Sequence, residues 1–178
     1  VNLNAGDAVL DIGCNDGTLL NKYGFEKKLK RYGVDPSSEK FLHMFQNDIK
    51  VLTDFFSYNK VNEFSEGKKF KVISSIAMFY DIDDPVEFAK SIELLLDDEG
   101  FWIIEIAYLP LMMKNLAYDQ IMHEHLTYLS LRQMEIIFEK SNLKVVDFSI
   151  NSVNGGSILL AACKKDFKCD INVEKIIF

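Results

Sequence analysis

The chain has 178 residues, 48% of them hydrophobic and 26% charged, which is typical of one folded domain with a full-sized core. Its formal net charge of -7, without a lysine- and arginine-rich run, argues against a protein that binds nucleic acid by neutralising phosphates. No apolar stretch reaches the roughly 18 residues of a membrane-spanning helix, and the first residues do not form a signal peptide. We therefore expect a cytoplasmic domain with neither a membrane nor a nucleic-acid partner.

The three cysteines indicate neither a disulfide framework nor a zinc site. Cys14, Cys163 and Cys169 are odd in number and lack the spacing of metal ligands. Buried, reduced thiols are the simpler interpretation, and we predict no metal site.

Both ends of the chain suggest a piece of a longer protein. The sequence starts without methionine only eight residues before a predicted strand, and residues 174–178 form an apolar stub. We expect one domain over residues 1–165, and we expect residues 166–178 to lead to a further domain.

Apolar, β-branched runs of strand length recur along the chain, and segments with helical periodicity separate most of them. This alternation predicts an α/β fold with a mostly parallel sheet and helices on both faces. The nearly continuous apolar run at 102–106 is typical of a strand that is buried on both sides. The seven predicted strands are 9–12, 32–34, 51–56, 72–76, 101–107, 145–150 and 158–163.

Two helices carry clear start signals. Asp84 before Pro85, with Glu87 following, combines an N-cap, a proline at the first helical position and an acid in the first turn, so we predict a helix to Leu96. The run 130–133 has the pattern of a capping box, which predicts a second helix to Lys140.

The last connection differs from the others because residues 151–157 leave no room for a helix. The last strand must therefore be antiparallel to its neighbour. Such a seven-stranded sheet resembles that of Rossmann-like class I methyltransferases rather than that of nicotinamide-dependent enzymes.

A glycine-containing turn follows the first predicted strand, at the carboxyl edge of the sheet where ligands bind in this architecture. Glycine allows unusual backbone angles and a close approach of a cofactor to the main chain. An acid here can meet the cationic amino end of S-adenosylmethionine, whereas it disfavours NAD, whose diphosphate is anionic. The residues expected at this turn are Asp11, Gly13, Cys14, Asn15, Asp16 and Gly17.

The ends of the next strands supply further expected cofactor contacts. Asp35, before Pro36, lies about twenty residues beyond the turn, where a carboxylate can accept hydrogen bonds from both ribose hydroxyls. An ordinary role as a turn acid is the alternative for Asp35. Asp54, Phe55 and Phe56 end the third predicted strand and are expected to flank the adenine, and Ile76 and Ala77 end the fourth.

Residues 108–130 form an insert that is too long for a usual loop and too apolar for a disordered one. It contains His123, Glu124 and His125, and three interpretations of the histidines are open. They can bind a metal, although further ligands are not evident. They can fasten the insert to the sheet. Alternatively, one of them is a general base that a neighbouring carboxylate orients.

Several motifs resemble the sugar C-methyltransferase family, whose members act on nucleotide-linked deoxy-keto-sugars. The resemblance covers nearly the whole chain and rests on residues 11–20, 33–37, 78–81, 118–125, 128–131 and 154–157. It implies that His125 removes a proton beside the sugar ketone, with Glu124 and Tyr118 as its neighbours. Met122 stands where some members have tyrosine. The resemblance also implies an N-terminal zinc module and a further C-terminal domain as flanking partners.

Two other residues emerge at the same edge of the predicted sheet. Tyr80 follows the fourth strand and Asn154 follows the sixth, so one pocket can collect them together with the insert. Tyr80 is a candidate catalytic residue or a partly buried aromatic that covers the cofactor. Asn154 is a candidate substrate ligand or part of a simple hairpin turn.

The overall interpretation is methyl transfer from S-adenosylmethionine to a carbon next to a ketone. The alternatives are an O- or N-methyltransferase for another small molecule, and a cofactor-binding module that is inactive alone. Because Arg31 and Arg132 are the only arginines, we expect a flanking domain to hold the substrate phosphates.

Overall fold

The computed structural model describes residues 2–23 and 28–169, which build a seven-stranded sheet of order β3-β2-β1-β4-β5-β7-β6. Its strands are β1 Ala8–Ile12, β2 Lys30–Val34, β3 Ile49–Leu52, β4 Phe70–Ile76, β5 Leu96–Ala107, β6 Leu143–Asn151 and β7 Ser157–Lys164. The predicted seven-stranded α/β sheet is confirmed. Residues 170–178, most of the predicted C-terminal stub, lie outside the described residues.

The helices are α1 Thr18–Lys22, α2 Tyr58–Phe64, α3 Pro85–Leu95, α4 Leu109–Asn115 and α5 Leu131–Lys140. Short 3₁₀ helices are η2 Pro36–Met44, η3 Phe79–Asp81, η4 Tyr118–Gln120 and η5 Val153–Gly155. Within the described residues, no helix is long and apolar enough to cross a membrane.

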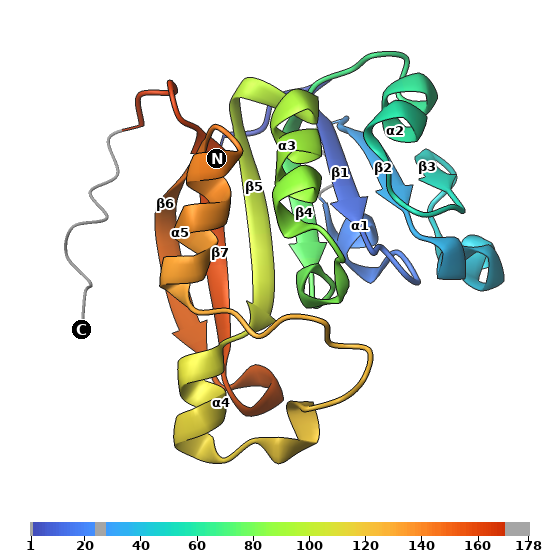
Figure 1. Cartoon of the computed structure of the whole chain (residues 1–178). Helices are drawn as coiled ribbons and strands as arrows, with labels where there is room; N and C mark the ends of the chain where they lie inside the picture. The colour runs from blue at the N-terminus through green and yellow to red at the C-terminus, as the bar shows by residue number, and fades with distance from the viewer. Residues whose placement is uncertain (1, 24–27, 170–178) are drawn as a thin grey trace.

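The strand directions follow the prediction. β1 to β5 pair in parallel, and β7 is antiparallel to both of its neighbours, β5 and β6. The carboxyl ends of the parallel strands therefore meet at one edge, the lower edge in Figure 1, where the insert 108–130 also lies.

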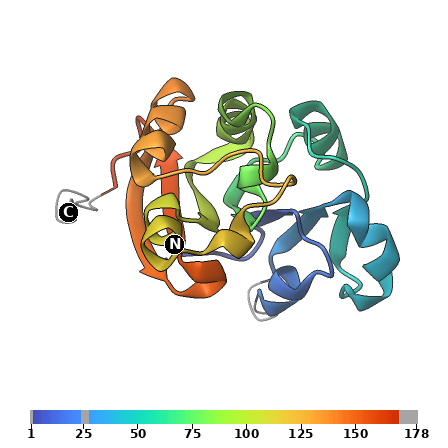
Figure 2. The same ribbon diagram turned by 60° about the horizontal axis from the view of Figure 1, so that its bottom comes forward.

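The helices form one layer on each side of the sheet (Figure 2). On one side α2, α3 and α5 cover a large core with Trp102 at its centre, where the ring packs against Phe79 and Phe138. On the other side α1 and η2 cover a smaller cluster that includes Leu20 and Phe45.

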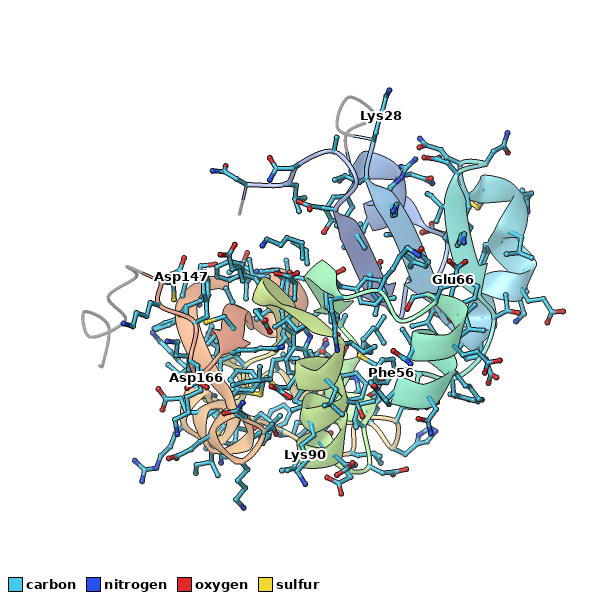
Figure 3. The ribbon with its side chains drawn as sticks, turned by 90° about the horizontal axis from the view of Figure 1, so that it is seen from above. Lys28, Phe56, Glu66, Lys90, Asp147 and Asp166 are labelled. Atoms are coloured by element: carbon cyan, nitrogen blue, oxygen red, sulfur yellow. The ribbon has the colours of Figure 1, made fainter. Side chains whose placement is uncertain are left out.

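The second face is only partly covered. Figure 3 shows Lys90 of α3 on the helix-covered side and Asp147 of β6 on the opposite side. Among the described residues, no helix packs over the β5-β7-β6 part of this opposite face, and Asp147 and Ser149 are exposed there.

Several predicted boundaries were wrong; β5, for example, begins at Leu96 and not at residue 101. The predicted strand 51–56 is β3 Ile49–Leu52, because β2 ends at Val34 and offers no further backbone partner to Asp54. The predicted helix 85–96 ends at Leu95, because Leu96 already pairs with Phe70 as the first residue of β5. The start signals were correct: the Asp84 side chain accepts hydrogen bonds from the N–H groups of Val86 and Glu87.

Candidate functional site

The turn between β1 and α1 requires its glycines. Gly13 has a φ of 77° and Gly17 a φ of 76°, angles that other residues adopt only with strain. A Cβ on Gly17 would lie 2.5 Å from the ring of Phe45, and one on Gly13 would lie 3.1 Å from Met78 Cγ. The side chains of Phe45 and Met78 therefore pack closely against the turn.

Asp35 holds this turn in place from the end of β2. Its Oδ2 accepts a hydrogen bond from the Asn15 N–H at 3.0 Å, and its Oδ1 accepts one from the Ser37 N–H at 2.6 Å. Ser38 completes the link by donating its hydroxyl to the Asn15 carbonyl at 2.7 Å. Asp35 thus acts as a turn acid, the alternative role considered for it, and it also lines a cavity.

That cavity, here called the strand-edge cavity, has a volume of about 670 Å³ and opens at the carboxyl ends of β1, β2 and β4. Five of the residues expected to contact a cofactor line it together: Gly13, Asp35, Pro36, Phe55 and Phe56. Aromatic and acidic groups therefore face each other across a space large enough for a nucleoside.

Asp54 is not part of the cavity wall. Its carboxylate forms an ion pair with Lys60 at 2.6 Å and accepts a hydrogen bond from the Phe55 N–H at 2.7 Å. The hydrogen bond from Lys60 is the main reason that the pKa of Asp54 is lowered. In this structure the Asp54 carboxylate is paired with Lys60 of α2 and does not line the cavity.

A second cavity of about 560 Å³ lies on the other side of the turn and shares Gly13 with the first. Asp11 lines it from the end of β1 and is 4% exposed, with its Oδ1 accepting a hydrogen bond from the Ser74 hydroxyl at 2.5 Å. Burial raises the pKa of the Asp11 carboxyl to about 6. Asp11 thus changes its charge close to neutral pH.

The remaining turn residues have structural partners. Burial raises the pKa of the Cys14 thiol to about 12, so this cysteine is a protonated side chain beside Ser38. Asp16 accepts a hydrogen bond from the Thr18 N–H at 3.0 Å and thereby caps α1. Ile76 lines the second cavity, whereas Ala77 is exposed and adopts a φ of 55°.

Hydrogen bonds hold the insert 108–130 at its base and at its tip. At the base, the Tyr108 N–H donates to the Gly156 carbonyl, just before β7, at 2.9 Å. At the tip, the N–H groups of Leu126 and Thr127 both donate to the carbonyl of Tyr80 at 3.0 Å. The segment after His125 is therefore fixed to the residues that follow β4.

His125 lies at this tip, partly buried between two aromatic rings. Its ring centroid is 4.2 Å from that of Tyr80 and 6.3 Å from that of Tyr128. Its Nδ1 is 2.9 Å from the carbonyl oxygen of Gln120, so Nδ1 carries the proton and Nε2 is left as the basic nitrogen. The imidazole is thus oriented by the insert itself.

The other predicted residues of the insert lie further from this arrangement. His123 and Glu124 are exposed, and Tyr118 is 69% exposed. Tyr118 lines an apolar cavity of about 410 Å³ with Met112, Leu116, Ile121 and other side chains of the insert. Tyr128, and not Tyr118, is the insert tyrosine beside His125.

Asn154 lies in the turn between β6 and β7. Its side chain is exposed, and its φ of 52° is that of a tight turn. The following Gly155 accepts a hydrogen bond from Asn115 at 2.7 Å, and a Cβ on it would lie 2.6 Å from Ala117. The turn therefore supports α4 of the insert.

Sequence reasoning gave no role to Ser74, Met78 or Asp81, although it singled out the segment 78–81 as a motif. Met78 and Asp81 line the strand-edge cavity, and Ser74 holds Asp11. Their position directly at or after the end of β4 was the available signal, since functional side chains gather at the carboxyl ends of strands. Among the described residues, no cluster of three or more histidine, cysteine or acidic side chains is arranged to hold a metal.

Comparisons with known proteins agree with this architecture. A family model described as a methyltransferase domain matches residues 2–147. The C-methyltransferase NovU of Streptomyces niveus is 30% identical over 165 residues, which cover 91% of this chain and 39% of NovU. The chain thus spans about two fifths of the length of that relative.

Solved structures share the fold at low sequence identity. One similar structure is a chain from the complex between the Haloferax volcanii Trm112 methyltransferase activator and a putative methyltransferase. It has a TM-score of 0.70 and 16% identity, and the match covers 91% of this chain and 84% of that solved chain. The plantazolicin methyltransferase BpumL, solved with a triazolic desmethylPZN analogue and SAH, has a TM-score of 0.63 and 16% identity. The match covers 89% of this chain and 76% of the BpumL chain. The chain therefore belongs to the class I, S-adenosylmethionine-dependent methyltransferase domain family.

Proposed function

We propose that this domain transfers a methyl group from S-adenosylmethionine to a carbon next to a ketone in a nucleotide-linked sugar, with His125 as general base. One observation carries the proposal: the His125 imidazole packs on Tyr80 of η3, and Asp81, the next residue along the chain, lines the strand-edge cavity together with Met78. This contact supports a position of the basic nitrogen close to the expected cofactor site.

The residues present fit S-adenosylmethionine. Gly13 lines both cavities, so a ligand there can lie close to the main chain, and Asp35 lines the strand-edge cavity, where its carboxylate can accept hydrogen bonds from ribose hydroxyls. Asp11 in the second cavity supplies negative charge for the amino end. The bound cofactor supplies an electrophilic methyl group on a cationic sulfur.

In the proposed reaction, Nε2 of His125 takes the proton from the acceptor carbon, and the bonding electron pair stays on the substrate as an enolate. The carbon then forms a bond to the methyl group, while the sulfur–methyl bond breaks and its electrons remain on sulfur. A positioned base of this kind contributes about 10² to 10⁴ in rate. Orientation of the two reactants contributes the larger share.

The substrate class is supported by the relative NovU, which is named a C-methyltransferase. The diphosphate of a nucleotide-linked sugar needs cationic partners. Arg31 already forms an ion pair with Asp48, near the start of β2. We propose that the flanking part of the full-length protein holds the phosphates.

The test is methyl transfer by the wild type, His125→Asn and the matched control His43→Asn, with a nucleotide-linked keto-sugar and the whole protein. We expect His125→Asn to abolish product formation and to leave S-adenosylhomocysteine binding nearly unchanged. His43 lies exposed on η2 and serves as the control for loss of a histidine. Retained turnover in His125→Asn would exclude the base, and a product methylated on oxygen or nitrogen would exclude carbon methylation.

A further inference from the structure

Two of the three cysteines, Cys163 and Cys169, lie in contact with each other. Cys163 belongs to β7, and Cys169 belongs to the stretch 165–169 that follows this strand. Their Sγ atoms are 3.9 Å apart, and both thiols are free in this structure. Because a disulfide holds its sulfur atoms about 2.0 Å apart, a movement of about 2 Å would join the two residues.

Cys163 is buried on a face of the sheet that no described helix covers. Successive side chains of a strand point to opposite faces, so Cys163 shares the face of Ala161. Ala161 pairs with Asp147 of β6, whose side chain is exposed on that face. Cys163 is nevertheless 0% exposed. Its cover must therefore come from a segment other than a helix.

The stretch 165–169 supplies this cover, at the upper end of the sheet in Figure 1 and opposite the insert. The Phe167 ring packs edge-on against Phe101 of β5, with a centroid distance of 5.7 Å. The Phe167 carbonyl also accepts a hydrogen bond from Lys144 Nζ at 2.6 Å. Contacts other than the one between the thiols thus hold the stretch against the sheet.

The two side chains of the stretch that face the sheet match two neighbouring positions on it. The register of β5 and β7 places Phe101 and Cys163 next to each other. Phe167 lies against Phe101 and Cys169 lies against Cys163, while the residue between Phe167 and Cys169 is exposed. The aromatic contact therefore fixes the position of the thiol contact beside it.

We propose that Cys163 and Cys169 form a reversible disulfide that fastens the stretch 165–169 to β7 when a small disulfide such as oxidised glutathione is present. Cys169 attacks one sulfur of the oxidant, whose S–S bond breaks and releases one glutathione thiol. Cys163 then attacks the Cys169 sulfur and releases the second glutathione thiol. The two cysteines thereby lose two electrons and two protons, and the two glutathione thiols gain them.

The surroundings of the two thiols set the order of these steps. Burial raises the pKa of the Cys163 thiol to about 12, so this thiol is protonated at neutral pH. The thiolate is the nucleophile, and Cys169 is the partly exposed member of the pair. The oxidant therefore reacts first at Cys169. Ring closure by Cys163 is the slow step, and its rate should rise with pH.

The test compares the wild-type protein after incubation with dithiothreitol and after incubation with oxidised glutathione. Free thiols are then blocked, and the folded protein is digested with trypsin without reduction. Only a disulfide keeps the peptides of Cys163 and Cys169 together, because trypsin cleaves between them at Lys164, Lys165 and Lys168. We expect mass spectrometry to detect the linked peptides after oxidation and not after reduction.

Thermal unfolding measures whether the bond fastens the stretch. Oxidation should raise the unfolding temperature of the wild type by about 5 °C, because a closed loop restricts the unfolded chain. Cys169→Ser should lose both the linked peptides and this increase. The matched control is Cys14→Ser, which removes a buried thiol on the other side of the molecule, beside Ser38, and should retain both responses.

Three results would overturn the proposal. The first is a Cys163 thiol that stays free in excess oxidant, with or without a stable glutathione adduct on Cys169. The second is a linkage of either residue to Cys14. The third is an unfolding temperature that does not change when the bond forms. None of these results depends on methyl transfer, so the proposed function is tested separately.

Discussion

The ring of Tyr80 packs on the imidazole of His125 at a centroid distance of 4.2 Å, and the Tyr80 backbone carbonyl holds the two residues that follow His125. Tyr80 therefore holds the tip of the insert through its backbone carbonyl and supports the imidazole through its ring, together with the hydrogen bond from His125 Nδ1 to the Gln120 carbonyl. The aromatic ring of Tyr80, and not its hydroxyl group, makes this contact.

Replacement of the Tyr80 ring should reduce methyl transfer by about tenfold, because the base loses its fixed orientation. We expect this loss in Tyr80→Ala and near wild-type turnover in Tyr80→Phe, which keeps the ring. Initial rates with saturating cofactor measure the effect. Equal losses in the two variants would instead assign a chemical role to the hydroxyl group.

The order of strands and helices was predictable because each element has a local signal. The capping box at Ser130, for example, is formed: the Ser130 N–H donates to Gln133 Oε1 at 2.8 Å. The short connection at 151–157 predicted the antiparallel β7 for a geometric reason, since only a helix-length crossover returns a strand in parallel.

Side-chain partners within the site were less predictable. Asp54 was expected at the cavity, but its carboxylate forms an ion pair with Lys60, six residues further along the chain in α2. Tyr118 and Tyr128 both belong to the insert, and only its path in space decides that Tyr128 lies beside His125. Such contacts depend on tertiary packing, which a sequence pattern does not encode locally.

The different surroundings of Asp35 and Asp54 predict different effects on cofactor binding. Asp35→Asn should weaken S-adenosylhomocysteine binding by about tenfold or more, since a charged acceptor for the ribose is lost and the Asn15 contact is weakened. Asp54→Asn removes the same charge outside the cavity and should change the affinity less than twofold. Isothermal titration calorimetry gives both values, and a similar loss in the two variants would argue against a ribose contact by Asp35.

Gly17 and Gly67 provide a matched pair for the packing of the turn. Both have positive φ, but a Cβ on Gly67 meets no atom within 4 Å, whereas one on Gly17 collides with Phe45. Gly67→Ala should lower the free energy of unfolding by about 1 kcal/mol from backbone strain alone. Gly17→Ala should lower it by about 2–4 kcal/mol, because a buried ring must move. Urea unfolding measures both free energies. Equal losses in the two variants would show that the Phe45 ring can move without lowering the stability.

The raised pKa of Asp11 predicts opposite effects on stability and on cofactor binding. A carboxyl whose pKa is about 6 in the folded protein and near 3.9 in the unfolded chain favours the folded state below pH 4, and this contribution is lost as the pH rises through 6. Above pH 6 the buried charge therefore costs about 3 kcal/mol. Asp11→Asn keeps an acceptor for the Ser74 hydroxyl and removes that charge.

We expect the ligand-free Asp11→Asn variant to unfold at a higher temperature than the wild type at pH 7.5, with the difference shrinking toward pH 5. The same variant should bind S-adenosylmethionine about tenfold more weakly at pH 7.5, because the cationic amino end loses its counter-charge. In the wild type, affinity should fall as the pH decreases through 6, whereas in Asp11→Asn it should be less sensitive to pH over that range. Thermal unfolding and calorimetric titration at pH 5, 6 and 7.5 measure these effects. A stability difference that stays constant with pH would show that Asp11 does not titrate in this range, and the charge on Asp11 would then have no part in the pH dependence of binding.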